Sequence, residues 1–242
     1  MIKVIVHITK AVIAVVLSLL CLSCGFDFKS VDGDGNVTSQ KRQISGNFTE
    51  VSAERGLEVI IQQGSETSVT VNADTNLQQH IKTEVKGNAL KISADTNIGN
   101  GTKTITVVIP TIKSLSTESS AQIKSDSPLN GDSMQLSSSS GSSIQVNLNY
   151  KKIECETSSG AHIEVAGQTE NLEASSSSGS NINAKALKAE TVKADASSGG
   201  TTTVNPTKKL SADASSGGKV NYVSTPSQLK KNASSGGTVS QL

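Results

Sequence analysis

A seven-residue stretch, ADASSGG, occurs at residues 194–200 and again at residues 212–218, and it belongs to a longer repeat. Each unit carries a Ser-Ser-Gly sequence, and the repeat glycines are Gly141, Gly160, Gly179, Gly199, Gly217 and Gly236. The intervals between these glycines are 19, 19, 20, 18 and 19 residues. In an earlier, imperfect copy, ESSAQI, Ala121 takes the glycine position. A fixed period of this size predicts stacked units, none of which can bury its apolar face alone.

Apolar residues keep a constant offset from each repeat glycine. Seven positions before it stand Met134, Ile153, Leu172, Val192, Leu210 and Leu229. Three positions after it stand Ile144, Ile163, Ile182, Thr202, Val220 and Val239, and five positions after it Val146, Val165, Ala184, Val204, Tyr222 and Gln241. A flexible Ser/Gly linker would not hold such residues in register over six copies. We therefore expect these positions to face a common core.

The period and the composition together predict an all-β fold, a right-handed parallel β-solenoid with coils of about 19 residues. Helical repeats need about 33 residues or more, and the leucine-rich repeat signature is missing. In a solenoid each strand pairs in parallel with its equivalent one coil away, about 4.8 Å along the axis. Aromatic residues make up only 2% of the chain and tryptophan is absent, so the core must be narrow and aliphatic.

The Ser-Ser-Gly sequence is interpreted as the corner of a coil, because glycine allows a sharp turn and serine hydroxyls can bond turn backbone groups. Four positions before the glycine stand Ser137, Glu156, Ser175, Asp195, Asp213 and Asn232. Asp195 and Asp213 would lie one coil apart, about 5 Å. Such a pair could hold a cation or share a proton. The simpler interpretation is a solvated charged face.

In the N-terminal half of the folded region, the sequence pattern predicts longer strands joined by turns. Alternating or β-branched segments occur at residues 57–61, 68–73, 89–94 and 104–110, separated by turn clusters. One helical turn is expected at residues 76–81. We therefore assign residues 44–242 to one β-solenoid domain. Its N-terminal strands cover residues 44–115, and its Ser-Ser-Gly repeats cover residues 116–242.

The first 23 residues predict a signal peptide, because Lys3 and Lys10 precede a short apolar run. That run ends at CLSCG, which resembles the bacterial lipobox and predicts acylation of Cys24, although Cys21 stands where leucine is usual. An ordinary cleaved signal peptide is the alternative. Residues 24–43 are polar and rich in glycine and aspartate, and we interpret them as a flexible tether. Their DGDGNV stretch lacks the glycine and glutamate that complete a calcium loop.

Few residues suggest chemistry. Cys155 stands between Glu154 and Glu156, whose carboxylates would raise the thiol pKa, so we expect a small buried residue and no nucleophile. His80 and His162 lie in no triad-like pattern, and His80 is expected on the surface. We predict no catalytic residues, cofactor or metal. The net charge of +1 gives no reason to expect a nucleic-acid partner.

From RQISGNFTEVSAERGLEVII through ITVVIPTIKSLSTESSAQI into the repeats, about 200 residues, the chain resembles the putative auto-transporter adhesin, head GIN domain family. The resemblance implies a secreted or lipid-anchored bacterial protein with a β-helical fold. It carries no catalytic residues over to this chain.

These observations predict a non-catalytic lipoprotein of the outer membrane, anchored through Cys24 and facing either the cell surface or the periplasm. Its expected role is adhesion, or binding of a protein or glycan ligand, and it could form a homo-oligomer. Two alternatives remain open: a structural scaffold or assembly subunit, and a polysaccharide-active β-helix enzyme. The enzyme is disfavoured, because no paired carboxylates in a cleft or activated nucleophile can be assembled from the residues.

Overall fold

A computed structural model of the chain describes residue 10 and residues 30–242. The expected signal peptide, apart from residue 10, and the acylation site Cys24 therefore lie outside the described residues. None of the described residues belongs to a helix with the length and hydropathy of a membrane-spanning segment. The described chain from Val31 to Leu242 is one compact unit built from strands and turns.

Nineteen strands make up the described fold. Those of the N-terminal half are β1 (Ser30–Val31), β2 (Val37–Arg42), β3 (Glu50–Ala53), β4 (Glu58–Gln63), β5 (Ser68–Asp74), β6 (Ile81–Lys86), β7 (Ala89–Ala94), β8 (Asn97–Ile98) and β9 (Lys103–Ile109). Those of the repeats are β10 (Ser114–Thr117), β11 (Gln122–Ser125), β12 (Leu129–Ser138), β13 (Ser143–Thr157), β14 (His162–Ser176), β15 (Asn181–Ala196), β16 (Thr201–Ala214), β17 (Lys219–Tyr222), β18 (Gln228–Ala233) and β19 (Thr238–Gln241). The predicted all-β class is confirmed.

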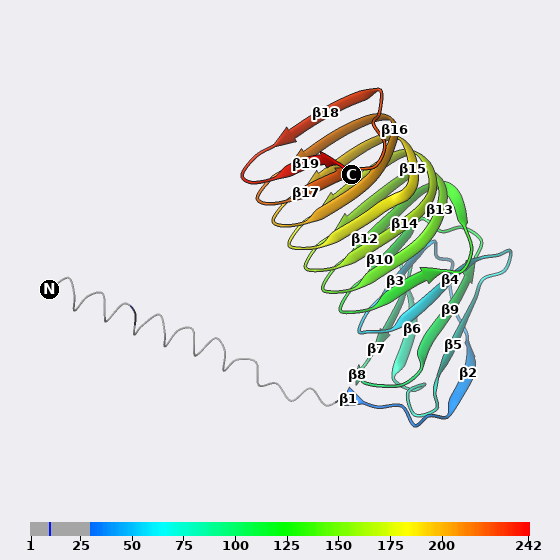
Figure 1. The fold of residues 1–242 in the computed structure, drawn as a ribbon. Coiled ribbons are helices and arrows are strands. Elements are labelled where there is room, and N and C mark those ends of the chain that lie inside the picture. The colour runs from blue at the N-terminus through cyan, green and yellow to red at the C-terminus, as the bar shows by residue number, and fades with distance from the viewer. Residues whose placement is uncertain (1–9, 11–29) are drawn as a thin grey trace. The chain divides into compact units, whose positions relative to one another are not determined.

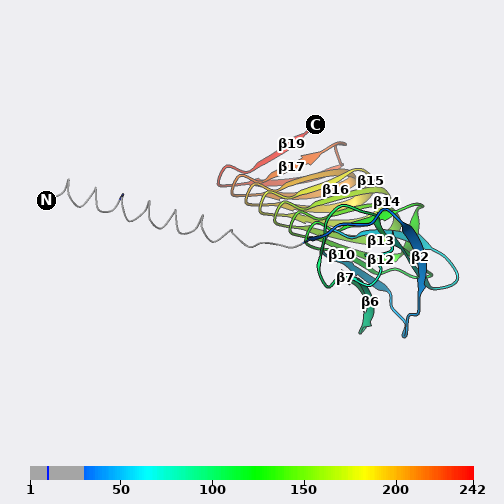
Figure 2. The same ribbon diagram turned by 90° about the horizontal axis from the view of Figure 1, so that it is seen from below.

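The repeats form a β-solenoid of stacked coils (Figures 1 and 2). Strands β12 to β16 pair in parallel with their sequence neighbours, and most of β13 pairs with β14 at a constant offset of 19 residues, as in Ile153↔Leu172. The 20- and 18-residue units cause three register shifts, which lie between Glu164 and Ala166, between Asn183 and Lys188, and between Ala189 and Thr191. Length variation is therefore absorbed in the bend of each long strand, and the Ser-Ser-Gly corners stay in register.

Each Ser-Ser-Gly corner is a tight turn with two consecutive residues in the left-handed region. In one coil Ser159 has φ 52° and Gly160 has φ 71°, and the Ala161 amide donates to the Ser158 carbonyl at 3.1 Å. Two positive φ values in succession are typical of a type I′ turn. The Gly160 amide also donates to the Ser178 carbonyl of the next coil at 3.2 Å, so the corners stack. The predicted corner is confirmed, and its second serine shares the unusual backbone conformation.

The solenoid begins earlier in the sequence than the predicted division at residue 116. Arg55 and Gly56 have φ values of 59° and 67°, and the Gly56 amide donates to the Ser119 carbonyl at 2.9 Å. Strand β3 pairs in parallel with β10, and β4 with β11. Strands β3 and β4 are therefore an additional coil at the base of the stack. On its other side β3 pairs with β7, and β4 pairs with β9.

The core is aliphatic and continuous through the stack. All the residues expected to face inward are buried in the central coils: Ile163, Leu172, Ile182, Val192, Val204, Leu210 and Val220. The last coil differs: Leu229 is 39% exposed, Gln241 is exposed and Val239 is only partly buried, because no further coil in the described structure covers β18 and β19. The expectation that the repeat positions face a common core is therefore wrong for Leu229 and Gln241.

Part of the expected flexible tether is ordered. Strand β2 pairs antiparallel with β5, with Val37 opposite Asp74 and Arg42 opposite Val69. The preceding loop is also fixed, since Asp32 Oδ1 accepts from the Asn100 amide at 2.9 Å and Asn76 Nδ2 donates to the Asp32 carbonyl at 2.8 Å. The prediction of a tether is wrong for these residues, because their partners lie far away in the sequence.

The expected helical turn is a hydrogen-bonded turn over residues 75–80, in which the amides of Leu77 and Gln78 both donate to the Asp74 carbonyl. Strand β6, which the sequence did not predict, begins at Ile81 and pairs antiparallel with β7. Strands β4, β5, β7 and β9 agree with their predicted ranges to within about two residues, whereas β1, β2, β3 and β8 were also not predicted.

Candidate functional site: the corner groove

A groove runs beside the Ser-Ser-Gly corners along the stack, and we call it the corner groove. One stretch of about 420 Å³ is lined by Ser175, Ser176, Asp195, Ala196, Ser197, Asp213, Ala214, Ser215, Asn232, Ala233 and Ser234. A second stretch of about 300 Å³ is lined by Ser137, Ser138, Ser139, Glu156, Thr157, Ser158, Ser175 and Ser177. Ser175 belongs to both, so the two stretches adjoin.

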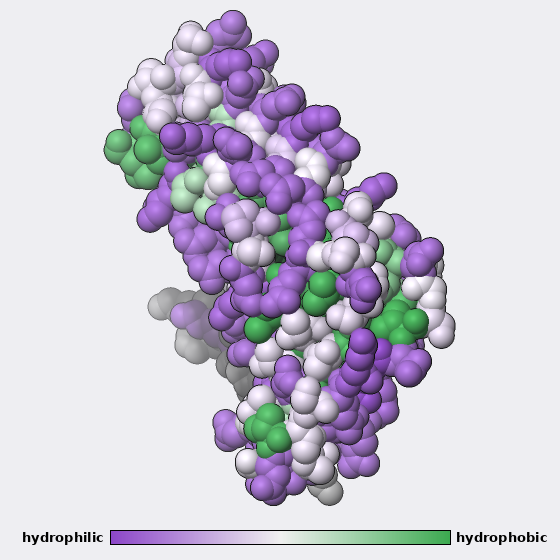
Figure 3. Space-filling view, turned by 90° about the vertical axis from the view of Figure 1, so that its right-hand side faces the viewer, coloured by the Kyte–Doolittle hydropathy of each residue, from purple (hydrophilic) through white to green (hydrophobic). Residues whose placement is uncertain are grey.

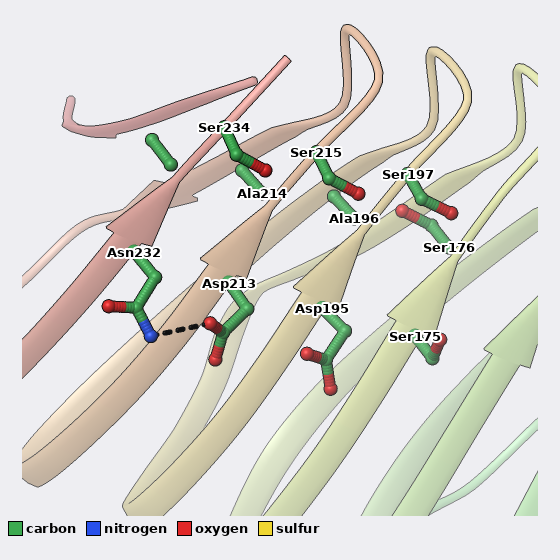
Figure 4. Close-up of a pocket in the computed structure, with 11 residues that line it drawn as sticks. Ser175, Ser176, Asp195, Ala196, Ser197, Asp213, Ala214, Ser215, Asn232 and Ser234 are labelled. Carbon is green, nitrogen blue, oxygen red and sulfur yellow. Dashed lines mark hydrogen bonds between the residues drawn. The ribbon is translucent and has the colours of Figure 1, made fainter. Parts of the chain in front are cut away.

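Two rows of outward side chains form the corner groove (Figure 4). The first row is the predicted column, and parallel pairing confirms its register: Ser137↔Glu156↔Ser175↔Asp195↔Asp213↔Asn232. The second row contains the first serine of each corner, including Ser197, Ser215 and Ser234. Small residues such as Ala196 and Ala214 lie between the rows. The groove is therefore polar, shallow and repeated from coil to coil.

Asp195 and Asp213 are direct neighbours across adjacent coils, as the sequence predicted. Asn232 Nδ2 donates to Asp213 Oδ1 at 2.7 Å, and Lys193 Nζ lies 3.7 Å from Asp195 Oδ2. Asp213 thus has a hydrogen-bond donor and Asp195 an ion-pair partner, and both side chains are partly exposed. Among the described residues no group of three or more histidine, cysteine or acidic side chains is arranged to hold a metal ion. The geometry fits a hydrogen-bonding surface better than a cation site.

Beneath the groove the corner is held by buried hydroxyls. Ser142 Oγ donates to the Thr117 carbonyl at 2.9 Å, and Ser180 Oγ donates to Thr157 Oγ1 at 2.9 Å. Ser176 Oγ lies 2.8 Å from Thr202 Oγ1. Hydrogen bonds between buried hydroxyls offset the cost of removing them from water. They therefore fix the backbone that presents the groove.

Other residues considered for chemistry do not assemble a catalytic site. Cys155 is buried, and burial raises the pKa of its thiol to about 12. The expectation of a small buried residue is confirmed, and the cause of the high pKa is burial and not the neighbouring glutamates. A thiol with such a pKa is neutral at physiological pH and is a poor nucleophile.

His80 forms an ion-pair geometry that the sequence did not suggest. Its Nδ1 lies 2.8 Å from Asp95 Oδ1, and Lys82 Nζ lies 3.1 Å from Asp95 Oδ2. Hydrogen bonds from His80 and Lys82 lower the pKa of Asp95. The other ring nitrogen, Nε2, faces the Gln79 amide at 3.4 Å and not a hydroxyl. The pair therefore lacks the nucleophile of a hydrolytic triad.

Stacked parallel coils with a repeated polar groove define the class of protein: β-solenoids that present a long lateral surface. The chain belongs to the family described as putative auto-transporter adhesin, head GIN domain, which matches residues 47–226. The family description points to binding and to a cell-surface or envelope location. No curated protein matches the chain.

Solved structures share the fold. A putative adhesin from Bacteroides fragilis is 18% identical, with a TM-score of 0.80, and the match covers 88% of this chain and 100% of that one. A putative adhesin from Parabacteroides distasonis is 21% identical, with a TM-score of 0.71 and coverage of 88% and 100%. A putative lipid binding protein from the same organism is 19% identical, with a TM-score of 0.69 and the same coverage. Identities this low establish the fold alone.

Proposed function

We propose that this protein is a non-catalytic binding protein of the cell envelope that adheres to an extended polar ligand through the corner groove. The observation that supports this most strongly is the repetition of equivalent polar side chains, coil after coil, along one groove. A ligand made of repeating units can form the same contact at each coil. Many weak, equivalent contacts give adhesion through multivalency.

The chemistry of the groove favours a glycan as the first ligand class to test, with a protein segment as the alternative. Serine hydroxyls, carboxylates and the Asn232 amide can exchange hydrogen bonds with sugar hydroxyls. The groove is shallow and polar, which does not suit an acyl chain, since ligand sites for apolar molecules are concave and mostly apolar. Figure 3 shows the side of the molecule opposite the corners, where the surface is mainly hydrophilic with separate hydrophobic patches.

The anchor is proposed from the sequence: acylation of Cys24 would hold the protein at the outer membrane. Each buried methylene of an acyl chain contributes about 0.8 kcal/mol, so several chains make a stable anchor. The Cys24→Ala protein is expected to lose its acyl label and to leave the membrane fraction. If it stayed with the membrane without an acyl label, another segment would be the anchor.

A binding screen tests the proposed role. The purified protein is applied to arrays of glycans and matrix proteins, and intact cells are treated with protease to show whether the domain faces the medium. We expect saturable binding to at least one polymer without cleavage. Cleavage of a polysaccharide that is abolished by Asp195→Ala with Asp213→Ala would place the enzyme alternative first.

A scaffold role is a second candidate, because the last coil has unpaired strand edges. In the described structure, β18 pairs only with β16 and β19 only with β17, and the whole of β18 is exposed. Open edges can pair with another chain. Light scattering of the purified protein tests this: a concentration-dependent oligomer supports the scaffold role, and a monomer at all concentrations contradicts it.

A further inference from the structure

A cavity of about 330 Å³ lies where β2 ends and β5 begins, away from the repeats. Its polar lining consists of the cations Lys41 and Arg42, the hydroxyl residues Thr67 and Ser68, and the amide Asn47. No carboxylate is among the described residues that line it. Neither cation has an acidic side chain within ion-pair distance in the described part of the chain. The positive charge of the cavity is therefore not neutralised locally.

Hydrogen bonds to Gln78 hold the guanidinium of Arg42 in one orientation. Its Nη2 donates to the Gln78 carbonyl at 2.8 Å and to Gln78 Oε1 at 3.0 Å. Gln78 is only 4% exposed, and its own Nε2 donates to the Thr38 carbonyl at 2.8 Å and the Val71 carbonyl at 3.2 Å. A long side chain that is already ordered loses less conformational freedom when it binds a ligand.

One donor of this guanidinium has no acceptor. Arg42 Nε is buried, and none of the described residues accepts a hydrogen bond from it. A buried donor of a charged group without a partner costs free energy, and such groups call for an explanation such as a bound ion. An anion bound beside this guanidinium in the cavity would neutralise its charge.

We propose that this cavity binds a phosphate group. Arginine presents a planar fork of donors that matches phosphate oxygens, and lysine adds a point charge. Two cations with nearby hydroxyls suit a tetrahedral anion that carries several acceptor oxygens better than they suit a single carboxylate. This site is separate from the corner groove. Phosphate binding here can therefore be tested independently of the proposed adhesive role.

Isothermal titration of the purified protein tests the proposal at constant ionic strength. The probes are inorganic phosphate, the soluble phosphodiester glycerophosphoglycerol and acetate. We expect 1:1 saturable binding with a dissociation constant on the order of 1 mM or tighter for at least one phosphate probe. Preference for inorganic phosphate indicates a free phosphate or phosphomonoester, and preference for glycerophosphoglycerol indicates a phospholipid headgroup.

Variants identify the site. Arg42→Gln and Lys41→Glu are each expected to weaken phosphate binding at least tenfold, while Arg55→Gln, which removes the same charge from the exposed Arg55, leaves it unchanged. Lys41 is exposed, so its replacement does not threaten folding. No saturable binding by the unmodified protein would overturn the proposal. Equal affinity for acetate, or unchanged binding in the Lys41→Glu protein, would overturn it as well.

Discussion

At the scale of single residues, the second serine of each corner is as constrained as the glycine that follows it. From Ser140 to Ser235 these serines have φ values between 47° and 55°. A left-handed conformation costs about 1–2 kcal/mol for a residue with a side chain. Stacked hydrogen bonds, such as Gly160 amide to Ser178 carbonyl, repeat at each coil and offset that cost.

Two adjacent glycines test this view of the corner. A Cβ at Gly217 would meet nothing within 4 Å but would sit at φ 73°, whereas a Cβ at Gly218 would lie 2.4 Å from the Ala196 carbonyl oxygen. Gly217→Ala should therefore cost about 1–2 kcal/mol of unfolding free energy, and Gly218→Ala should cost more, because backbone must move. Urea denaturation compares the two. An equal or smaller loss for Gly218→Ala would contradict the packing argument.

Cys155 gives a prediction that depends on pH. Burial raises the pKa of its thiol from 9.0 to about 12, so the folded protein holds the proton more tightly than the unfolded chain. The stability that this contributes is complete below pH 9 and is lost as the pH rises towards 12. The melting temperature should fall over that range, and less steeply in Cys155→Ala. A thiol reagent should not label native Cys155 at pH 8; rapid labelling of the folded protein would contradict its burial.

At the scale of strands and coils, equivalent repeat positions differ in energy according to their place in the stack. Leu172 in β14 is fully buried between coils, whereas Leu229 in β18 is 39% exposed. Position in the sequence repeat alone does not set burial; the presence of a covering coil does. The same substitution at the two positions therefore separates the effect of the repeat position from the effect of a covering coil.

The substitution Leu172→Asp should destabilise the fold by roughly 4 kcal/mol, because it buries an unpaired charge. Leu229→Asp, the matched control, should cost less than about 1 kcal/mol, because its side chain reaches water. Thermal and urea unfolding measure both. A loss at Leu229 as large as that at Leu172 would contradict the stacking order of the coils.

The repeat alone predicted the central coils, because each Ser-Ser-Gly corner and each inward aliphatic residue recurs at a fixed offset. It did not predict the first coil, since residues 57–118 separate its corner at Arg55–Gly56 from the next corner at Ser119 and Ser120, and that interval is far longer than one period. The order in β2 also escaped prediction, because its partner strand β5 lies about thirty residues away and is antiparallel.

The candidate sites likewise combine features that the sequence predicted with features that only the structure shows. The column containing Asp195 and Asp213 followed from spacing, since parallel coils place equal offsets side by side. The depth of the corner groove depends on small residues, such as Ala196 and Ala214, between its two rows, which only the structure shows. The cavity at Arg42 is lined in part by Ser68, and Gln78 orients the Arg42 side chain. Both residues are distant from Arg42 in the sequence, so no sequence pattern indicates these contacts.

At the scale of the whole molecule, the stack of coils turns a short repeat into a long, uniform surface. The corner groove runs from Ser137 to Ser234, across six coils, which corresponds to roughly 24 Å at the spacing of parallel strands. A ligand that spans several coils gains from each of them, so a change in one coil should weaken binding without abolishing it.

The most direct test is ligand binding with the corner groove blocked at one coil. Ser215→Arg places a long side chain in the groove, and Thr203→Arg places the same side chain on the outward face of β16, outside the groove lining. Against the ligand identified by the screen, we predict that Ser215→Arg lowers affinity about tenfold or more and that Thr203→Arg leaves it unchanged. Equal affinity of both variants and the unmodified protein would contradict binding through the groove.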